Sequence, residues 1–174
     1  MKLNLGCGIE KRKGWLNCDI SKEVRPDLIL DIEDKLPFDD NDIEEVYMSH
    51  ILEHIINFIP VMHEIWRVCD DGAKIIIKTP FYSSWGQYND PTHVRFFTPF
   101  TFNYFQKGTF SHEVKCKKDM FKVEKVIINF GVGSLSKLNF IINPLVNFNH
   151  TFYCRFFAWI IPCAEICYKL RVVK

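Results

Sequence analysis

Apolar and polar residues alternate along the chain in short blocks, and these blocks predict a β-sheet. Each candidate strand is a short run rich in apolar and β-branched residues, bounded by glycine, proline or acidic turns. Such runs lie at residues 3–5, 15–20, 27–32, 44–49, 73–78, 121–130 and 168–173. Strands joined by turns and crossover segments are typical of an open, mostly parallel α/β sheet.

Two segments between the strands carry helical signals. Apolar residues recur at helical spacing over 60–68, and the proline at the start suits a first helical turn. A polar turn at 70–72 would end this helix. Thr98 stands before a proline in an N-cap pattern, which predicts a second helix through residue 105.

Polar and glycine residues gather where the first strands end. Gly6-Cys7-Gly8, Asp19, Asp31 and Ser49-His50 each follow a predicted strand. Ligands of open parallel sheets bind beyond the carboxyl ends of the strands, so this convergence predicts a binding site. A parallel crossover normally takes at least about ten to twelve residues, usually with a helix. Ten residues separate Gly8 from Asp19 and eleven separate Asp19 from Asp31, so we expect these crossovers to be loops or single turns.

Each of these residues has an ordinary interpretation beside a functional one. Glycines after a strand let the backbone approach a ligand, although a plain tight turn also uses them. Asp19 can accept two hydrogen bonds from a ribose diol, or can be a simple turn residue. Asp31 can accept from an adenine amine while Ile32 donates its backbone N–H, or it can cap the following turn. The ordered set is more specific than any single member.

Five segments together resemble a known family. They are LNLGCG (3–8), GWLNCDI (14–20), DIEDKLPFDDNDIEEVYMSHILEHI (31–55), MHEIWRVCDDGAKIIIKTPF (62–81) and NDPTHVRFFTPFTFNYF (89–105). They resemble the compact class I S-adenosylmethionine-dependent methyltransferases, of the methyltransferase type 11-like group. The resemblance is firm to about Phe105 and then fades, apart from the closing strand. It implies a Rossmann-like open twisted sheet of about seven strands, mostly parallel, with an antiparallel last strand and reduced first crossover helices.

The resemblance also implies a donor and its binding residues. The donor would be S-adenosyl-L-methionine and the product S-adenosyl-L-homocysteine. Gly6, Cys7 and Gly8 would wrap the methionine portion, Asp19 would hold the ribose hydroxyls, Asp31 and Ile32 would read adenine, and Ser49 and His50 would lie near the sulfonium. The donor-binding residues expected in all are Asn4, Gly6, Cys7, Gly8, Asp19, Ile20, Asp31, Ile32, Ser49 and His50. Asn4 departs from the family, which often has an acid there; its amide accepts a hydrogen bond without offsetting the donor's ammonium charge.

Methyl transfer from a sulfonium needs alignment and desolvation, and a catalytic base is optional. His93, Asp90 and His54 are the catalytic candidates, although His54 can equally cap or pack a helix and residues 90–93 can form a rigid structural loop. Trp85, with the nearby Tyr88, is a candidate for the acceptor pocket. A metal site from Asp90, His93 and His112 lacks any ligand spacing, so we predict none.

Charge and cysteine usage narrow the class of protein. The net charge is +1, without the strong basic surplus of nucleic-acid binders. The seven cysteines form no CxxC pair, which favours reduced thiols in the cytoplasm over structural zinc or disulfides. The start is too short and too soon interrupted to be a signal peptide, and no run reaches the ~20 apolar residues of a membrane span.

We therefore expect one domain over 1–174, with a donor-binding core and acceptor loop over 1–105. Residues 106–174 would supply the sixth and seventh strands with a helical cover. The apolar segment 135–161 has three interpretations: this cover, which its few cations favour, a homodimer surface, or a membrane-surface contact. The predicted function is methyl transfer to a small-molecule or glycan-type acceptor. The rivals are a non-catalytic relative that binds donor or product as a sensor or scaffold, and a membrane-surface or partner-binding module.

Overall fold

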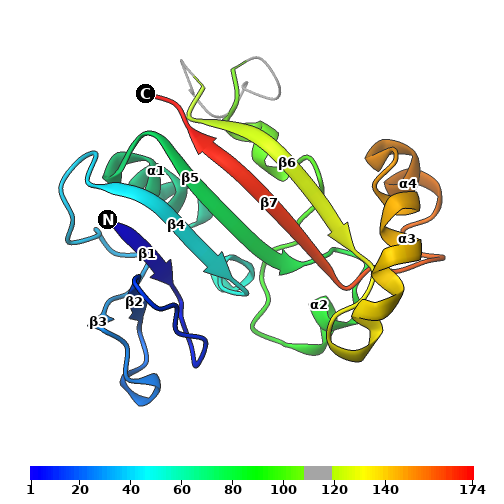
Figure 1. Ribbon diagram of the computed structural model, residues 1–174, viewed down its shortest axis with the longest axis horizontal. Coiled ribbons are helices and arrows are strands. Elements are labelled where there is room, and N and C mark those ends of the chain that lie inside the picture. Colours follow the sequence, from blue (N-terminus) through cyan, green and yellow to red (C-terminus); the bar gives the residue numbers. More distant parts are fainter. Residues whose placement is uncertain (108–118) are drawn as a thin grey trace.

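The computed structural model describes residues 1–107 and 119–174, and these residues form one mixed sheet (Figure 1). Its order is β3-β2-β1-β4-β5-β7-β6. The strands are β1 (Lys2–Leu5), β2 (Leu16–Asp19), β3 (Leu28–Ile29), β4 (Ile43–Ser49), β5 (Cys69–Pro80), β6 (Phe121–Asn129) and β7 (Glu165–Val172). Strands β1 to β5 run parallel, and β7 runs antiparallel to both of its neighbours. The predicted Rossmann-like fold with an antiparallel last strand is confirmed; His112 lies outside the described residues.

The first crossovers are reduced, as the short spacings predicted. The β1–β2 connection is a loop, and the β2–β3 connection contains one 3-10 turn, η1 (Lys22–Val24). Side-chain amides support the loop where a helix would otherwise pack. Asn17 Oδ1 accepts from Asn4 Nδ2 at 2.9 Å and from the backbone N–H of Arg12 at 2.8 Å. These paired amides satisfy buried polar groups that an irregular loop leaves open.

One face of the sheet carries the core. Helix α1 (Phe58–Val68) packs there, with the 3-10 helix η3 (Thr101–Phe105) beside it. The ring of Phe58 contacts Phe102 and Phe105 edge-on, which explains why α1 begins two residues before the predicted start. The second predicted helix is a 3-10 helix instead. The predicted turn at 70–72 lies within β5, which begins directly after α1, and a register shift opposite β4 accommodates it.

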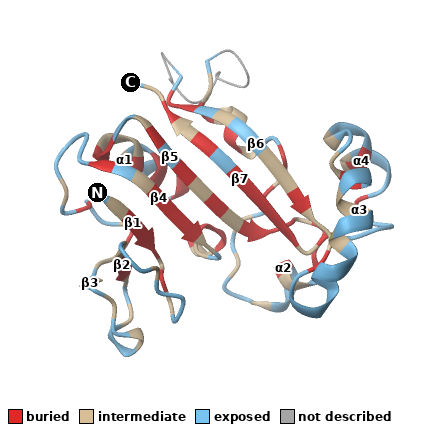
Figure 2. Ribbon diagram, viewed as in Figure 1, coloured by how far each residue is buried: buried red, intermediate tan, exposed pale blue. Residues whose placement is uncertain are grey.

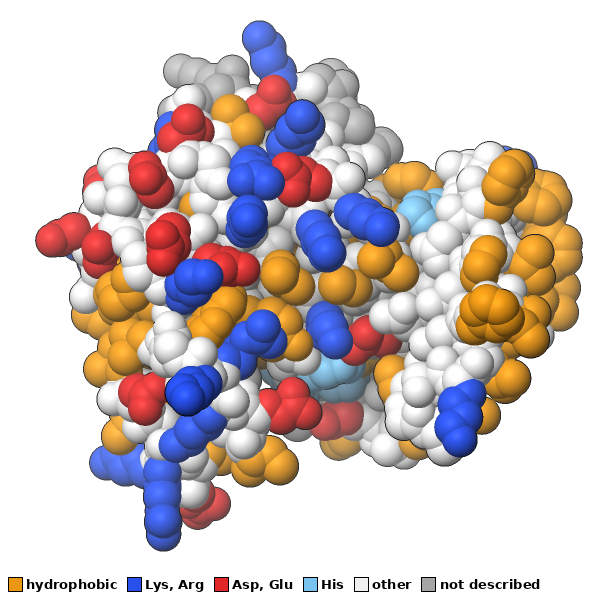
Figure 3. Space-filling view, in the orientation of Figure 1, with side chains coloured by type: hydrophobic (Ala, Val, Ile, Leu, Met, Phe, Trp, Pro, Cys, Tyr) orange, Lys and Arg blue, Asp and Glu red, His pale blue; other side chains and the backbone are white. Residues whose placement is uncertain are grey.

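The opposite face is lined by charged side chains. Lys74 on β5 pairs with Arg171 on β7, and Arg171 pairs with Lys122 on β6, so all three side chains point to the same side. The cations of this face are Lys2, Lys74, Lys78, Lys122, Lys125, Lys169 and Arg171. Figure 3 shows lysine and arginine side chains spread across this face. We call this surface the basic face.

The segment between β6 and β7 forms η4 (Gly133–Leu138), α3 (Asn139–Val146) and α4 (His150–Phe156). Asparagines spaced four apart, two on α3 and one at its C-cap, bind the end of β6 and the residues after it. Asn147 exchanges two hydrogen bonds of 2.7 Å with the backbone of Ile128. Asn143 Oδ1 accepts a hydrogen bond from the N–H of Phe130. Asn139 both accepts from the N–H of Gly131 and donates to its carbonyl oxygen. The helices therefore lie beyond the end of β6, not across a face of the sheet (Figure 1).

Most residues of α3, α4 and the following turn are exposed (Figure 2), and these include most of the large apolar residues of the segment. Phe140 is 86% exposed and Phe148 is 90% exposed, whereas Val146 and Tyr153 are buried. In the described residues, no helix combines the length and apolarity needed to cross a bilayer.

Candidate functional site

A first cavity lies beyond the carboxyl ends of β1, β2 and β4. Its volume is about 480 Å³, within the range of roughly 300–1,000 Å³ typical of small-molecule sites. It is lined by Gly6, Gly8, Asp19, Ile20, Leu30, Asp31, Ile32, Glu33, His50, Ile51, His54 and Ile55. The glycine turn, the two acids and His50 therefore meet at one edge of the sheet, as predicted.

The two glycines of the turn after β1 have different roles. Gly6 has φ +65°, and a Cβ there would come within 2.3 Å of Ile51 Cδ1. Gly8 has φ +47°, and a Cβ there would meet nothing within 4 Å. The first glycine is thus required by packing and backbone conformation. The second leaves its side of the cavity open to a ligand.

Both acids are oriented by backbone N–H groups. Asp19 accepts from Gly8 N at 2.8 Å and from Ser21 N at 2.9 Å, using one oxygen for each. Asp31 Oδ1 accepts from Glu33 N at 2.8 Å. A carboxylate has about four acceptor positions, so each acid keeps capacity for a ligand hydroxyl or amine. Two fixed acids and an open glycine turn fit a nucleoside with a polar tail.

Three of the predicted donor-binding residues do not line this cavity. Asn4 is buried, and its amide donates to Asn17 Oδ1 and to the carbonyl of Glu10, so it supports the glycine turn from behind. Cys7 is buried beneath the same turn. Ser49 lines a different cavity, described below.

His54, a predicted catalytic candidate, also lines the first cavity, and the other lining residues were not foreseen. Leu30, Ile51 and Ile55 supply an apolar wall. Glu33 accepts hydrogen bonds from the backbone N–H groups of Ile56 and Asn57, which hold the pKa of this carboxyl below its usual value. Glu33 thereby joins the rim of the cavity to the start of α1.

A second cavity of about 480 Å³ lies beside the first. It is lined by Glu10, Tyr47, Ser49, His50, Lys78, Pro80, Ser84, Trp85, Gly86, Asp90, His93, Val132, Ala164 and Glu165. Trp85, Asp90 and His93 are therefore together, as the acceptor-loop prediction expected. Tyr88 is not part of this lining; its ring packs against Phe96 and Trp159.

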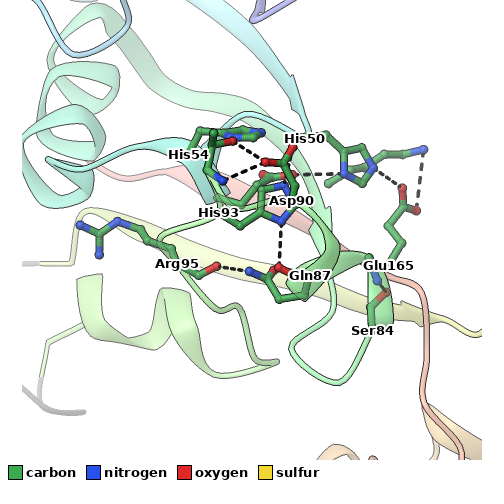
Figure 4. A network of polar contacts seen from close by, with 12 residues as sticks. His50, His54, Ser84, Gln87, Asp90, His93, Arg95 and Glu165 are labelled. Atoms are coloured by element: carbon green, nitrogen blue, oxygen red, sulfur yellow. Dashed lines mark hydrogen bonds and ion pairs between the residues drawn. The ribbon is translucent and has the colours of Figure 1, made fainter.

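His50 is the wall shared by the two cavities (Figure 4). It follows β4 with φ +54°, a left-handed conformation that is uncommon outside glycine. Its Nε2 lies 3.3 Å from a Glu165 oxygen and its Nδ1 lies 3.2 Å from Glu53 Oε1. Hydrogen bonds with Glu165 and then Glu53 raise the pKa of His50 to about 9, so the ring is charged at neutral pH.

Glu165 is the functional candidate that the sequence analysis missed. Burial raises its pKa, but the hydrogen bonds from His50 and Asn129 outweigh burial and hold the pKa below its usual value. It stands at the first residue of β7. Because β7 is antiparallel, its beginning lies at the edge where the parallel strands end. Attention to strand ends alone therefore overlooks it.

His54 and His93 come from different segments of the chain and meet edge to face, with ring centroids 4.7 Å apart. His54 lines the first cavity and His93 lines the second. Asp90 Oδ2 lies 3.9 Å from His93 Nε2. All three predicted catalytic candidates thus sit at the boundary between the cavities.

Comparisons with known proteins agree with this geometry. A family model described as a methyltransferase domain matches residues 3–77. No curated protein sequence matches the chain. Among solved structures, an S-adenosylmethionine-dependent methyltransferase from Archaeoglobus fulgidus superposes with a TM-score of 0.67 at 15% identity, covering 98% of this chain and 85% of that one.

Two further structures show how widely the fold is used. An S-adenosylmethionine-dependent methyltransferase from Mesorhizobium loti has a TM-score of 0.55 at 13% identity, covering 98% of this chain and 89% of that one. The cyclase SpnF has a TM-score of 0.60 at 14% identity, covering 99% and 75%. One fold can host several reactions, so these likenesses concern the fold. The chain is therefore similar to a methyltransferase domain over residues 3–77, and it shares its fold with S-adenosylmethionine-dependent methyltransferases.

Proposed function

We propose that the chain transfers a methyl group from S-adenosylmethionine to a small-molecule or glycan-type acceptor bound in the second cavity. The observation that carries this proposal is the pair of neighbouring cavities with His50 as their common wall. One cavity has the residues for a nucleoside, and the other is open for a second reactant. Such a division is what a two-substrate transfer requires.

The residues of the first cavity fit the donor. S-adenosylmethionine carries its methyl group on a sulfonium and is already activated for transfer. Asp19 would accept from the ribose hydroxyls and Asp31 would accept from the adenine amine, and the open space beside Gly8 would leave room for the methionine portion. Glu53 and Glu165 flank His50 and offset the positive charge of its ring, so a cationic sulfonium at this boundary would lie near two carboxylates.

The second cavity suits a polar acceptor. Asp90, Glu165 and Glu10 can accept hydrogen bonds from hydroxyl or amine groups, and Lys78 can donate. Trp85 presents an exposed ring against which a sugar or another flat group can pack. The wall of acids and one aromatic ring supports a hydroxyl-rich acceptor over an apolar one.

Calorimetric titration with S-adenosylmethionine and S-adenosylhomocysteine tests the donor part of the proposal. Asp19→Ala should weaken binding by about 1–3 kcal/mol, because it removes two hydrogen bonds to the ribose. Asp39→Ala, an exposed aspartate outside both cavities, is the matched control and should bind as the wild type does. Unchanged affinity of Asp19→Ala would contradict the assignment. Donor binding without turnover over a broad panel of hydroxyl and amine acceptors would favour the sensor or scaffold alternative.

The outward apolar side chains favour a second role, which is binding to an anionic lipid bilayer. Phe140, Leu145, Phe148, Phe152, Trp159 and Ile160 are all more than half exposed. Figure 3 shows hydrophobic side chains over these helices at the right of the view, with the lysine and arginine side chains of the basic face to their left. Apolar side chains that enter the interface, with cations beside them, are the combination that anionic membranes recognise.

Sedimentation with lipid vesicles tests this second role. Phosphatidylglycerol-containing vesicles should retain the protein, and pure phosphatidylcholine vesicles should retain less. The double variant Phe140→Ser/Phe148→Ser should lose binding, whereas Ile9→Ser, equally exposed but remote from these helices, should keep it. A concentration-dependent dimer abolished by the same double variant, without vesicle binding, would assign the surface to a second copy of the chain.

A further inference from the structure

A cluster of metal-type ligands lies at the boundary of the two cavities. Glu53 and His54 belong to the 3-10 helix η2 (Leu52–His54), and His93 comes from the loop after α2 (Trp85–Asn89). One ligand atom from each of these three residues lies within 4.8 Å of the other two. Figure 4 shows His54 and His93 converging at this point, with Asp90 beside them.

Glu53 brings a buried oxygen that lacks a partner. Its side chain has 0% exposure, and one oxygen, Oε1, is bonded to His50. The other oxygen, Oε2, has no hydrogen-bond partner among the described residues. A buried carboxylate oxygen left unsatisfied costs about 1–3 kcal/mol or more, so a ligand that bonds to Oε2 would be favoured here.

Hydrogen bonds fix the tautomer of His54. Its Nδ1 lies 2.8 Å from Thr92 Oγ1. The hydroxyl of Thr92 donates to Asp90 Oδ1 at 2.6 Å, so its only hydrogen is already used. Thr92 must therefore accept from His54 Nδ1–H, which leaves a lone pair on Nε2 of the ring.

His93 has the same arrangement. Its Nδ1 lies 3.1 Å from the carbonyl oxygen of Gln87, and a carbonyl can only accept. The hydrogen of His93 is therefore on Nδ1, and its Nε2 also carries a lone pair. A metal-binding histidine typically donates its other N–H to a carbonyl or a polar side chain in this way.

We propose that Glu53 Oε2, His54 Nε2 and His93 Nε2 bind one divalent transition-metal ion of the zinc type. Two neutral imidazoles and a carboxylate are a donor set for zinc and its neighbours in the first transition row. Metal–ligand bonds of about 2.0–2.2 Å place the ligands of one ion up to about 4.4 Å apart, so a small closure of the side chains completes the site. Asp90 stands next to His93 as a further acceptor.

The proposed metal site lies between the two cavities, so a bound ion would be next to both. His54 lines the first cavity, whereas His93 and Asp90 line the second. An ion held by three protein ligands keeps an open coordination position, which a group of a molecule bound in either adjoining cavity would be able to occupy. No ligand spacing predicted this site, because the third ligand comes from a distant loop.

Cobalt and zinc titrations of the chelator-treated protein, without donor or acceptor, test the site. We expect one ion per chain by elemental analysis and visible absorption from bound Co²⁺ that added Zn²⁺ displaces. His93→Ala and Glu53→Gln should lower affinity by at least about tenfold. His63→Ala, an exposed histidine on α1 outside the cluster, is the matched control and should bind as the wild type does.

Thr92→Val gives a test that keeps all three ligands. It removes only the acceptor that fixes the His54 tautomer, and outer partners of this kind typically contribute about 10–100-fold in affinity. Equal Co²⁺ binding by the wild type, His93→Ala and Thr92→Val would overturn the site, as would no binding at all. Because these measurements use neither donor nor acceptor, failure of the metal site is distinguishable from failure of the methyltransferase proposal.

Discussion

The two cavities are similar in size but are built in different ways. The first takes all its lining from residues 6–55, and its polar groups follow consecutive strands. The second combines the end of β4, the loop around α2 and the start of β7, so its members are far apart in the sequence. A site built from neighbouring segments is visible in the sequence, whereas one built by long-range packing requires the fold.

Gly6→Ala should have the largest effect of the substitutions considered, because it disturbs the backbone turn on which the first cavity is built. The added Cβ would meet Ile51 Cδ1 at 2.3 Å, and φ +65° is unfavourable for alanine. Overpacking and backbone strain together should cost about 2–4 kcal/mol of unfolding free energy. Urea denaturation measures the loss. Gly14→Ala has a similar φ with no atom within 4 Å of the Cβ, so it should cost only about 1 kcal/mol. Equal losses in both variants would show that Ile51 yields to the new methyl group.

Trp85→Ala should act on the second cavity alone. The side chain is 78% exposed, so the free energy of unfolding should change by less than about 0.5 kcal/mol. Donor affinity by calorimetry should stay the same, while the KM for the acceptor rises about tenfold because a stacking surface is lost. A weakened donor affinity would mean that the two cavities are one functional unit.

Glu33→Gln should produce the smallest effect, and it tests whether the rim of the first cavity contributes to the stability of the fold. The pKa of Glu33 is lowered by the N–H groups of Ile56 and then Asn57, so the carboxylate stabilises the fold above its unfolded pKa. This contribution is lost as pH falls through the lower folded pKa. After allowance for solvent screening, wild type and variant should differ by about 0.5 kcal/mol at neutral pH and converge in acid. Parallel stability curves from neutral pH to acid would contradict this account.

The strands and the first cavity were predictable because they depend on local rules. Short apolar runs place the strands, and parallel strands bring Gly6, Asp19 and Asp31 to one edge. The wrong predictions concern tertiary packing. Phe58 extends α1, and the aromatic cluster around it accommodates a 3-10 helix where an α-helix was expected.

The polar contacts of the second cavity and of α3 could not be read from local patterns. Glu165 reaches the second cavity because β7 runs antiparallel to β5 and begins at the edge where the parallel strands end. Glu53 is buried where His50 and the segment after His93 pack against it. The asparagines at 139, 143 and 147 did carry a signal, since a four-residue spacing places them on one side of a helix. Their partner, the end of β6, could not be known before the sheet order.

The asparagines of α3 also protect the protein against unwanted assembly. An edge strand with free N–H and C=O groups is a template for pairing with another chain. Strand β6 forms one edge of the sheet, and asparagine side chains accept hydrogen bonds from the backbone N–H groups of Ile128 and Phe130 near its end. Earlier in β6, the charged Lys122 and Lys125 and a register irregularity make pairing with another strand unfavourable. At the opposite edge, β3 has only two residues and offers little to a new strand. The sheet is therefore closed to growth by strand addition, so fibrous aggregation through its edges is disfavoured.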